Sequence, residues 1–109
     1  MADTIMGVFD DGVVFRGFLR DPDGIFTSFD PPGSELTWPF AVNPAGVITG
    51  YYCDAVGCRS FLRASDGTIT SFDPPGSTVS AAFAINPAGV VTGTFYDASG
   101  LGHGFVYRP

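Results

Sequence analysis

A repeat of 43 residues dominates this sequence and limits what the chain can fold into. Sliding the chain against itself by that length aligns three segments, and two of them match without a gap. The aligned segments are Phe18-Leu19-Arg20 with Phe61-Leu62-Arg63, Phe29 to Ser34 with Phe72 to Ser77, and Phe40 to Gly46 with Phe83 to Gly89. A duplication of this length predicts an array of similar structural units rather than one irregular domain.

Extending the same register backwards reveals part of a third copy. Ile5, Gly7, Phe9 and Asp11 fall on Ile48, Gly50, Tyr52 and Asp54. We therefore interpret the 109 residues as a single repeat domain with a partial unit over 1–34, a full unit over 35–77 and a partial unit over 78–109.

The composition indicates that each unit is made of β-strands. Fifteen Gly, nine Pro, eleven Phe and four Tyr favour short strands joined by tight turns, and no stretch has a sustained helical period. A period near 43 residues matches one propeller blade, whereas solenoid repeats of that length are helical. The expected fold is therefore all-β, with repeated four-stranded antiparallel blades in a propeller-like array.

Four strands are expected in the full unit, and turn sequences mark the joints between them. The expected strands are Leu36 to Val42, Gly46 to Asp54, Arg59 to Arg63, and Thr68 to Phe72. Asn43-Pro44-Ala45-Gly46 and Ser65-Asp66-Gly67 have the residues of tight turns. Paired prolines in Asp30 to Ser34 and Asp73 to Ser77 cannot form a tight hairpin, so these segments are expected to cross from one blade to the next.

Counting strands in this way gives three, then four, then three. Incomplete blades leave unpaired backbone groups and an apolar face, and a chain of this length cannot close a ring of four or more blades. We therefore expect oligomerisation to close the ring, with a homodimer of six partial or full blades as the simplest arrangement. Alternation in the second strand predicts that Ile48, Gly50, Tyr52 and Asp54 face a neighbouring blade.

Charge and hydropathy exclude two classes of partner. The formal net charge is −6, with no Lys, so no basic surface is expected for nucleic acid. Apolar runs fall far short of the roughly 20 residues that span a bilayer. The N-terminus lacks the basic and apolar regions of a signal peptide, and neither membrane insertion nor processing is expected.

One segment resembles a known bacterial repeat. Asn86-Pro87-Ala88-Gly89-Val90-Val91-Thr92-Gly93, followed by Tyr96-Asp97 and His103-Gly104-Phe105-Val106, resembles the HAF repeats of bacterial extracellular proteins. Those repeats usually read His-Ala-Phe, whereas this chain has Arg16-Gly17-Phe18, Arg59-Ser60-Phe61 and His103-Gly104-Phe105. The chain is also similar to small oligomeric β-propeller lectins. The resemblance implies a secreted or cell-surface location and glycan ligands.

Few residues of the sequence could act in catalysis. His103 is the only His, and it stands where Arg16 and Arg59 stand in the other copies, so the position selects a cation or a planar polar group. The sequence has no zinc-ligand spacing, phosphate-binding glycine loop or dinucleotide fingerprint. We expect a non-enzymatic protein without cofactors or metals.

Three acid–cation pairs span the turn between the second and third strands. They are Asp11 with Arg16, Asp54 with Arg59, and Asp97 with His103. One interpretation is a cross-strand charge pair that contributes little to stability. The other is a hydrogen-bonding edge at the blade rim that binds sugar hydroxyls once per blade.

Four further residues are candidates for ligand binding. Trp38, beside Glu35, departs from the repeat pattern and could stack on a pyranose, although a core or inter-subunit contact explains it equally well. Tyr51 and Tyr96 are better candidates than Tyr52, because Tyr52 aligns with Phe9 and Phe95 and should belong to the core. Cys53 and Cys58 flank one turn and could form a disulfide in an oxidising compartment.

These observations predict an oligomeric, carbohydrate-binding protein with repeated sites between blades. Weak single sites would then act together through avidity. A structural or protein-interaction repeat module without a sugar ligand is the alternative. An enzyme acting on polysaccharide is a third hypothesis and would need two carboxylates at a defined separation in one cleft.

Overall fold

The computed structural model describes residues 5–31 and 33–108, which form ten β-strands and no helix. The expected all-β class is confirmed. No helix in this part of the chain could cross a membrane. The strands are β1 (Ile5–Asp10), β2 (Phe15–Arg20), β3 (Phe26–Phe29), β4 (Leu36–Val42), β5 (Ile48–Cys53), β6 (Cys58–Arg63), β7 (Ile69–Phe72), β8 (Ser77–Ile85), β9 (Val91–Asp97) and β10 (Gly102–Tyr107).

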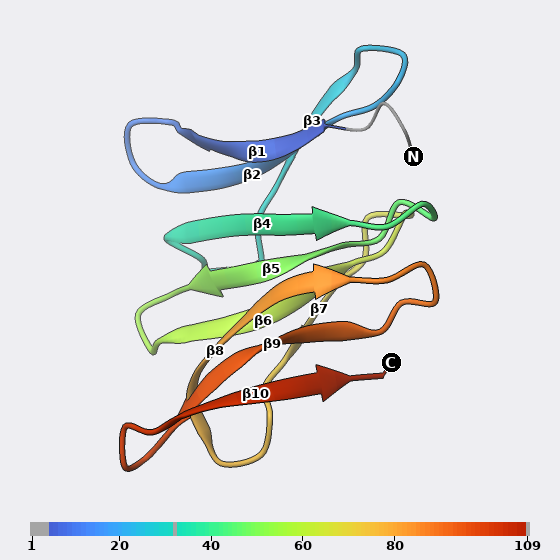
Figure 1. Cartoon of the computed structure of the whole chain (residues 1–109). Helices are drawn as coiled ribbons and strands as arrows, with labels where there is room; N and C mark the ends of the chain where they lie inside the picture. Colours follow the sequence, from blue (N-terminus) through green and yellow to red (C-terminus); the bar gives the residue numbers. More distant parts are fainter. Residues whose placement is uncertain (1–4, 32, 109) are drawn as a thin grey trace.

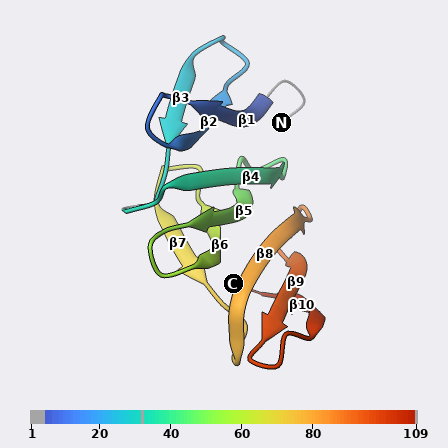
Figure 2. The same ribbon diagram turned by 90° about the vertical axis from the view of Figure 1, so that its left-hand side faces the viewer.

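The strands form three consecutive antiparallel groups, which we call unit 1 (β1 to β3), unit 2 (β4 to β7) and unit 3 (β8 to β10). This is the expected succession of three, four and three strands. Figures 1 and 2 show the units following one another along the molecule, with β1 and β10 in the outer units and no closed ring within the chain.

The segments with paired prolines connect the units, as expected. Between units 1 and 2 the only ladder contact is a parallel pairing of Phe15 with Leu36, and β8 begins a separate sheet. Because proline has no N–H to donate, these segments leave the ladder of one unit before the next unit begins. Pro32, which belongs to the first predicted crossover, lies outside the described residues.

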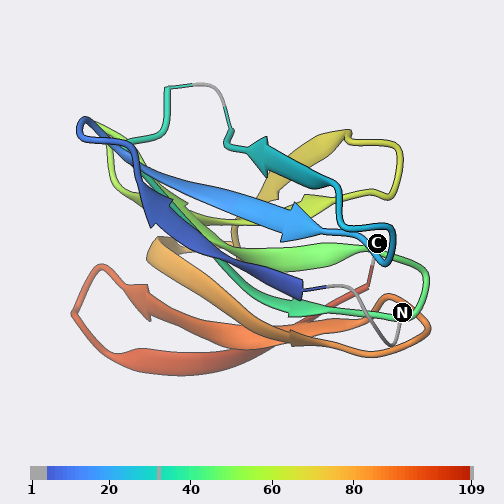
Figure 3. The same ribbon diagram turned by 90° about the horizontal axis from the view of Figure 1, so that it is seen from above.

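Tight turns end the strands where the sequence predicts them. In the β4–β5 turn the Gly46 N–H donates to the Asn43 carbonyl at 2.9 Å, and Gly46 has a φ of 85° that favours glycine. Asn43 also ties two units together, since its Nδ2 donates to the Asn86 carbonyl at 3.2 Å. Figure 3 shows the β1–β2 and β9–β10 turns at one end of the molecule and the β4–β5 turn at the other.

A bulge in the first strand recurs in both copies that contain it. The pairing of β4 with β5 shifts between Pro39 and Ala41, and that of β8 with β9 shifts between Ala82 and Ala84. Phe40 and Phe83 are therefore the extra residues, and their rings meet edge to face at 4.8 Å. The bulge brings backbone so close to Gly50 and Gly93 that a Cβ there would lie 2.1 and 2.2 Å from a carbonyl oxygen.

The core lies between units rather than within one. Ile48, Tyr52 and Phe61 of unit 2 cluster with Phe29 of unit 1, and Met6 and Leu19 of unit 1 pack against this cluster. Tyr52 is 5% exposed, so the expectation that it is a core residue is confirmed. The repeated face of the second strand packs against the neighbouring unit, as its alternation predicts.

Replacement of Gly50 by Ala tests the role of the bulge. We expect Gly50→Ala to destabilise the protein by roughly 1–3 kcal/mol, the usual cost of overpacking, because the new methyl group would meet the Trp38 carbonyl oxygen and the Pro39 backbone. Denaturant unfolding at fixed protein concentration measures the effect. Gly104→Ala is the control, since its Cβ would have its nearest neighbour at 3.9 Å. Equal stability of the two variants would contradict the explanation.

Candidate functional site

The three predicted acid–cation pairs form, at the β1–β2, β5–β6 and β9–β10 turns. Arg16 Nε lies 2.6 Å from Asp11 Oδ2, and Arg59 Nη2 lies 2.7 Å from Asp54 Oδ2. In unit 3, His103 Nε2 lies 2.9 Å from Asp97 Oδ2. The pairs therefore repeat along one end of the array, and their side chains are partly exposed.

The carboxylates of these pairs also hold their own turns. Oδ1 of Asp11 accepts the N–H groups of Val13 and Val14, and Oδ1 of Asp54 accepts those of Val56 and Gly57. These backbone hydrogen bonds are the largest cause of the lowered pKa of both carboxyls, and that of Asp11 falls to about 2. Both oxygens of each carboxylate are engaged, so little acceptor capacity remains for a sugar hydroxyl.

His103 is the structural counterpart of Arg59, as the repeat predicts. Arg59 lies opposite Tyr52, and His103 lies opposite Phe95, on which its ring stacks at 4.9 Å. The hydrogen bond to His103 is the largest cause of the lowered pKa of Asp97. His103 therefore takes the position of a cation that packs on an aromatic ring and holds a turn.

In unit 1 the arginine joins two loops. Arg16 Nη1 donates to Asp30 Oδ1 at 2.9 Å, in addition to its bond with Asp11. The hydrogen bond that Arg16 donates to Asp11 is the largest cause of the raised pKa of Arg16. Because Asp30 belongs to the crossover, this arginine fixes the β1–β2 turn to the exit from unit 1.

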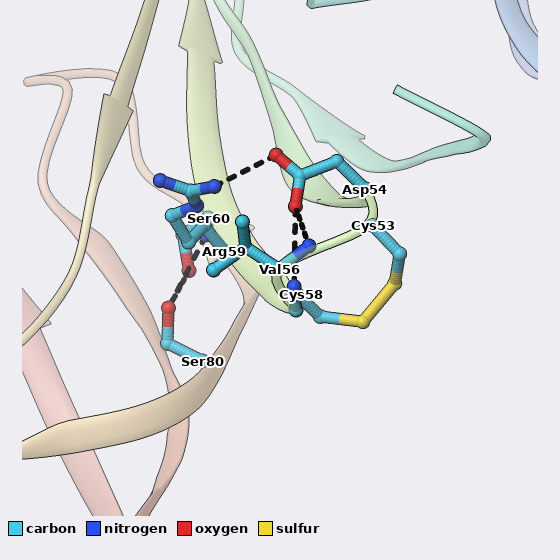
Figure 4. Close-up of a disulfide and its surroundings, with 8 residues drawn as sticks. Cys53, Asp54, Val56, Cys58, Arg59, Ser60 and Ser80 are labelled. Carbon is cyan, nitrogen blue, oxygen red and sulfur yellow. Dashed lines mark hydrogen bonds and ion pairs between the residues drawn. A yellow bond between two sulfur atoms is a disulfide. The ribbon is translucent and has the colours of Figure 1, made fainter. Parts of the chain in front are cut away.

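A disulfide closes the same turn in unit 2. Cys53 and Cys58 face each other across the end of the β5–β6 hairpin and are bonded (Figure 4). Among the described residues no free cysteine remains. Figure 4 also shows the Asp54–Arg59 pair on this turn and the hydrogen bond between Ser60 and Ser80. The side chains of Ser60 and Ser80 are fully buried. The disulfide and the ion pair therefore close this turn within unit 2, and the Ser60–Ser80 hydrogen bond links unit 2 to unit 3.

The other predicted ligand residues do not converge on one site. Trp38 and Tyr51 are cross-strand partners in unit 2, and the Tyr51 ring stacks on Phe40 at 5.7 Å. Tyr96 is 51% exposed and lies opposite Val79 in unit 3. Glu35 is exposed, and its backbone joins units 1 and 2 through bonds with Phe15 and Cys53. The structure therefore scatters these candidates over two units.

A cleft between units 1 and 2 lies at the end opposite the acid–cation pairs. Its volume is about 300 Å³, and the lining residues are Leu19, Asp21, Thr27, Ala45, Gly46, Ile48, Arg63 and Ser65. The Arg63 guanidinium lies over the Phe29 ring at 5.2 Å, and Arg63 Nε is buried without a hydrogen-bond partner among the described residues. A buried donor without a partner costs roughly 1–3 kcal/mol, so Arg63 Nε is a polar group that the surrounding side chains leave unsatisfied beside the cleft.

A second hollow lies between units 2 and 3. Its volume is about 390 Å³, and it is lined by Phe72, Asp73, Pro74, Pro75, Phe95, Phe105, Val106 and Tyr107. Tyr107 occupies in unit 3 the position that Arg63 occupies in unit 2. The ring of Tyr107 stacks on that of Phe72 at 4.0 Å between centroids. The two inter-unit spaces therefore differ in polarity, although the backbone around them repeats.

The sequence predicted sites between blades but not the residues that line these two spaces. The ten predicted site residues contribute nothing to the lining of the clefts described above. The repeated Phe-Asp-Pro-Pro segments were a signal, since Phe29 and Phe72 mark where units meet. Among the described residues no group of three or more His, Cys, Asp or Glu could hold a metal ion.

Comparison with known proteins returned no match to a family model, a curated protein or a solved structure.

The pKa of Asp11 gives a prediction for stability against pH. Because the folded pKa lies below the ordinary 3.8, the ionised group stabilises the fold above that value, and this contribution is lost as pH falls towards about 2. We expect Asp11→Asn to lower stability at pH 7 and to flatten its decline between those two pH values. Urea unfolding across this range measures both effects.

Asp23→Asn is the matched control, because it removes the same charge from an exposed turn position. If the two variants show the same pH dependence, Asp11 does not act through its hydrogen bonds and its ion pair.

Proposed function

We propose that this chain is a non-enzymatic, carbohydrate-binding protein of the lectin type, which assembles into an oligomeric, propeller-like ring and holds its ligand in a cleft between units. The observation that carries the proposal is the polar cleft between units 1 and 2, with its buried Arg63 Nε. Sugar sites combine apolar surface with a few oriented polar groups. This cleft supplies both.

Different residues of the cleft supply the apolar surface and the polar groups. Leu19 supplies apolar surface, while Asp21 and Arg63 supply a carboxylate and a planar set of N–H donors. Oδ1 of Asp21 accepts the N–H groups of Asp23 and Ile25, which holds the carboxylate in place before any ligand arrives. Because Phe29 supports the guanidinium from one side, Arg63 loses little freedom when it binds.

The disulfide supports the secreted or cell-surface location that the HAF resemblance implies. Disulfides persist in oxidising compartments and are rare in the cytosol of mesophiles. Cys53 and Cys58 form such a bond at an exposed hairpin end. A protein that meets glycans outside the cell would retain it.

A structural or interaction module is the second candidate, and the rim pairs favour it. The carboxylates of Asp11, Asp54 and Asp97 accept bonds from their own turns and from the paired cation. Rim groups used in this way stabilise hairpins and offer few free acceptors. Under the carbohydrate-binding proposal, therefore, the acid–cation pairs at the rim are structural, and the cleft between units 1 and 2 binds the ligand.

A glycan array followed by calorimetry tests the proposal. We expect at least one oligosaccharide to bind, and Arg63→Lys to weaken that binding about tenfold, which corresponds to losing one charge-assisted hydrogen bond. Arg16→Lys is the control, because Arg16 lies at the rim turn of unit 1 and does not line the cleft. Thermal unfolding of both variants verifies that each still folds.

Three results would contradict parts of the proposal. Absence of any sugar on the array would leave the interaction module as the better function. Binding that survives Arg63→Lys but is lost in Asp54→Asn would move the site to the rim. Hydrolysis of a bound oligosaccharide would make the chain an enzyme.

A further inference from the structure

Units 1 and 2 meet through an aromatic contact to which the two units contribute different faces. Phe29, in the last strand of unit 1, packs edge to face against Phe61 of unit 2 at 6.1 Å. Leu19 of unit 1 packs against the same cluster. We call the side of a unit that carries Phe29 or its equivalents its covering face, and the side that carries Phe61 or its equivalents its receiving face.

Units 2 and 3 meet in the same way. Phe72 is the repeat equivalent of Phe29, and it contacts Phe105, the equivalent of Phe61, at 6.2 Å. On the receiving faces of units 2 and 3, Ile48 and Val91 occupy equivalent positions, and both are fully buried. The chain therefore contains two copies of one interface, each with a covering face on a receiving face.

Within the part of the chain that the structure describes, no unit packs on the receiving face of unit 1. Ile5, equivalent to Ile48, is 54% exposed, and Phe26 is 66% exposed. Phe9, Phe18, Phe26 and Ser28 line an open apolar hollow of about 370 Å³. Phe18 is the equivalent of Phe61, so this hollow lies where units 2 and 3 each receive an aromatic side chain.

The covering face of unit 3 is exposed in the complementary way. Val106, equivalent to the packed Leu19, is 59% exposed. Thr92 and Gly104 are also exposed, whereas their equivalents in unit 2, Thr49 and Ser60, are fully buried. Figure 1 shows units 1 and 3 at opposite ends of the molecule. Each end of the chain therefore presents one half of the interface that the chain forms twice internally.

We propose that the covering face of unit 3 docks on the receiving face of unit 1 of a second copy, so that copies associate head to tail. The occupant is inferred from the chain itself, because in units 2 and 3 the same receiving face is covered by another unit of this sequence. A contact between two different faces is heterologous, and it closes a ring when the rotation between copies permits. The inference deepens the assembly part of the proposed function and does not need a sugar ligand.

A carboxylate introduced into either face tests the contact. We expect the wild-type chain to sediment as an oligomer, and both Phe26→Asp and Val106→Asp to sediment as monomers, because either change places a charged group in an apolar contact. Val13→Asp is the control, since Val13 is 88% exposed at the β1–β2 turn, outside both faces, and should leave the mass unchanged. Circular dichroism verifies the fold of each variant.

Mixing the two variants reveals the direction of the contact. Phe26→Asp keeps an intact covering face and Val106→Asp an intact receiving face, so an equimolar mixture should form a dimer of one copy of each. A wild-type monomer at 100-fold the concentration used for sugar binding, or a mixture that stays monomeric, would overturn the inference. The test is separate from sugar binding: an oligomer without a glycan ligand supports the inference alone, and a monomer that binds glycan supports only the site.

Discussion

Packing of one unit on the next is the interaction on which the rest of the structure depends. Each unit is a small, open antiparallel sheet, and such a sheet has little core of its own. Phe29 and Phe72 reach across to the following unit, and burial of each such side chain contributes roughly 1.5–3 kcal/mol. Because the apolar contacts lie between sheets, units 1 and 3 each keep one exposed apolar face among the described residues.

This arrangement separates the parts of the molecule that hold the fold from those suited to binding. The acid–cation pairs lie at hairpin turns, where the carboxylate of Asp54 serves its own backbone and Arg59. The cleft with Arg63 lies between units, where two sheets supply apolar and polar groups together. Binding between units is compatible with assembly, since every new contact between copies adds another space of the same kind.

Much of the fold could be predicted from the sequence because equivalent positions in the copies of the repeat can be compared with one another. Ile48 and Val91, which share one apolar position of the repeat, proved buried, whereas the equivalent Ile5 is exposed. The paired prolines marked the crossovers. The bulge was missed, although Pro39 within an expected strand and the Thr-Gly pairs at 49–50 and 92–93 were signals for it. Of the candidate site, the acid–cation pairs were predicted because their partners lie five or six residues apart.

The sequence by itself determined the β class, the length of the unit, the order of hairpin and crossover, and the local pairing at each turn. These depend on neighbours within a few tens of residues, and Pro, Gly and alternation report them directly. Only the tertiary structure decided which faces are covered, which carboxylate oxygens are already engaged, and where Arg63 is buried. Those properties arise from contacts between units, and repeats with the same local pattern can differ in them because a single substitution, such as Tyr107 for Arg63, changes the space between two sheets.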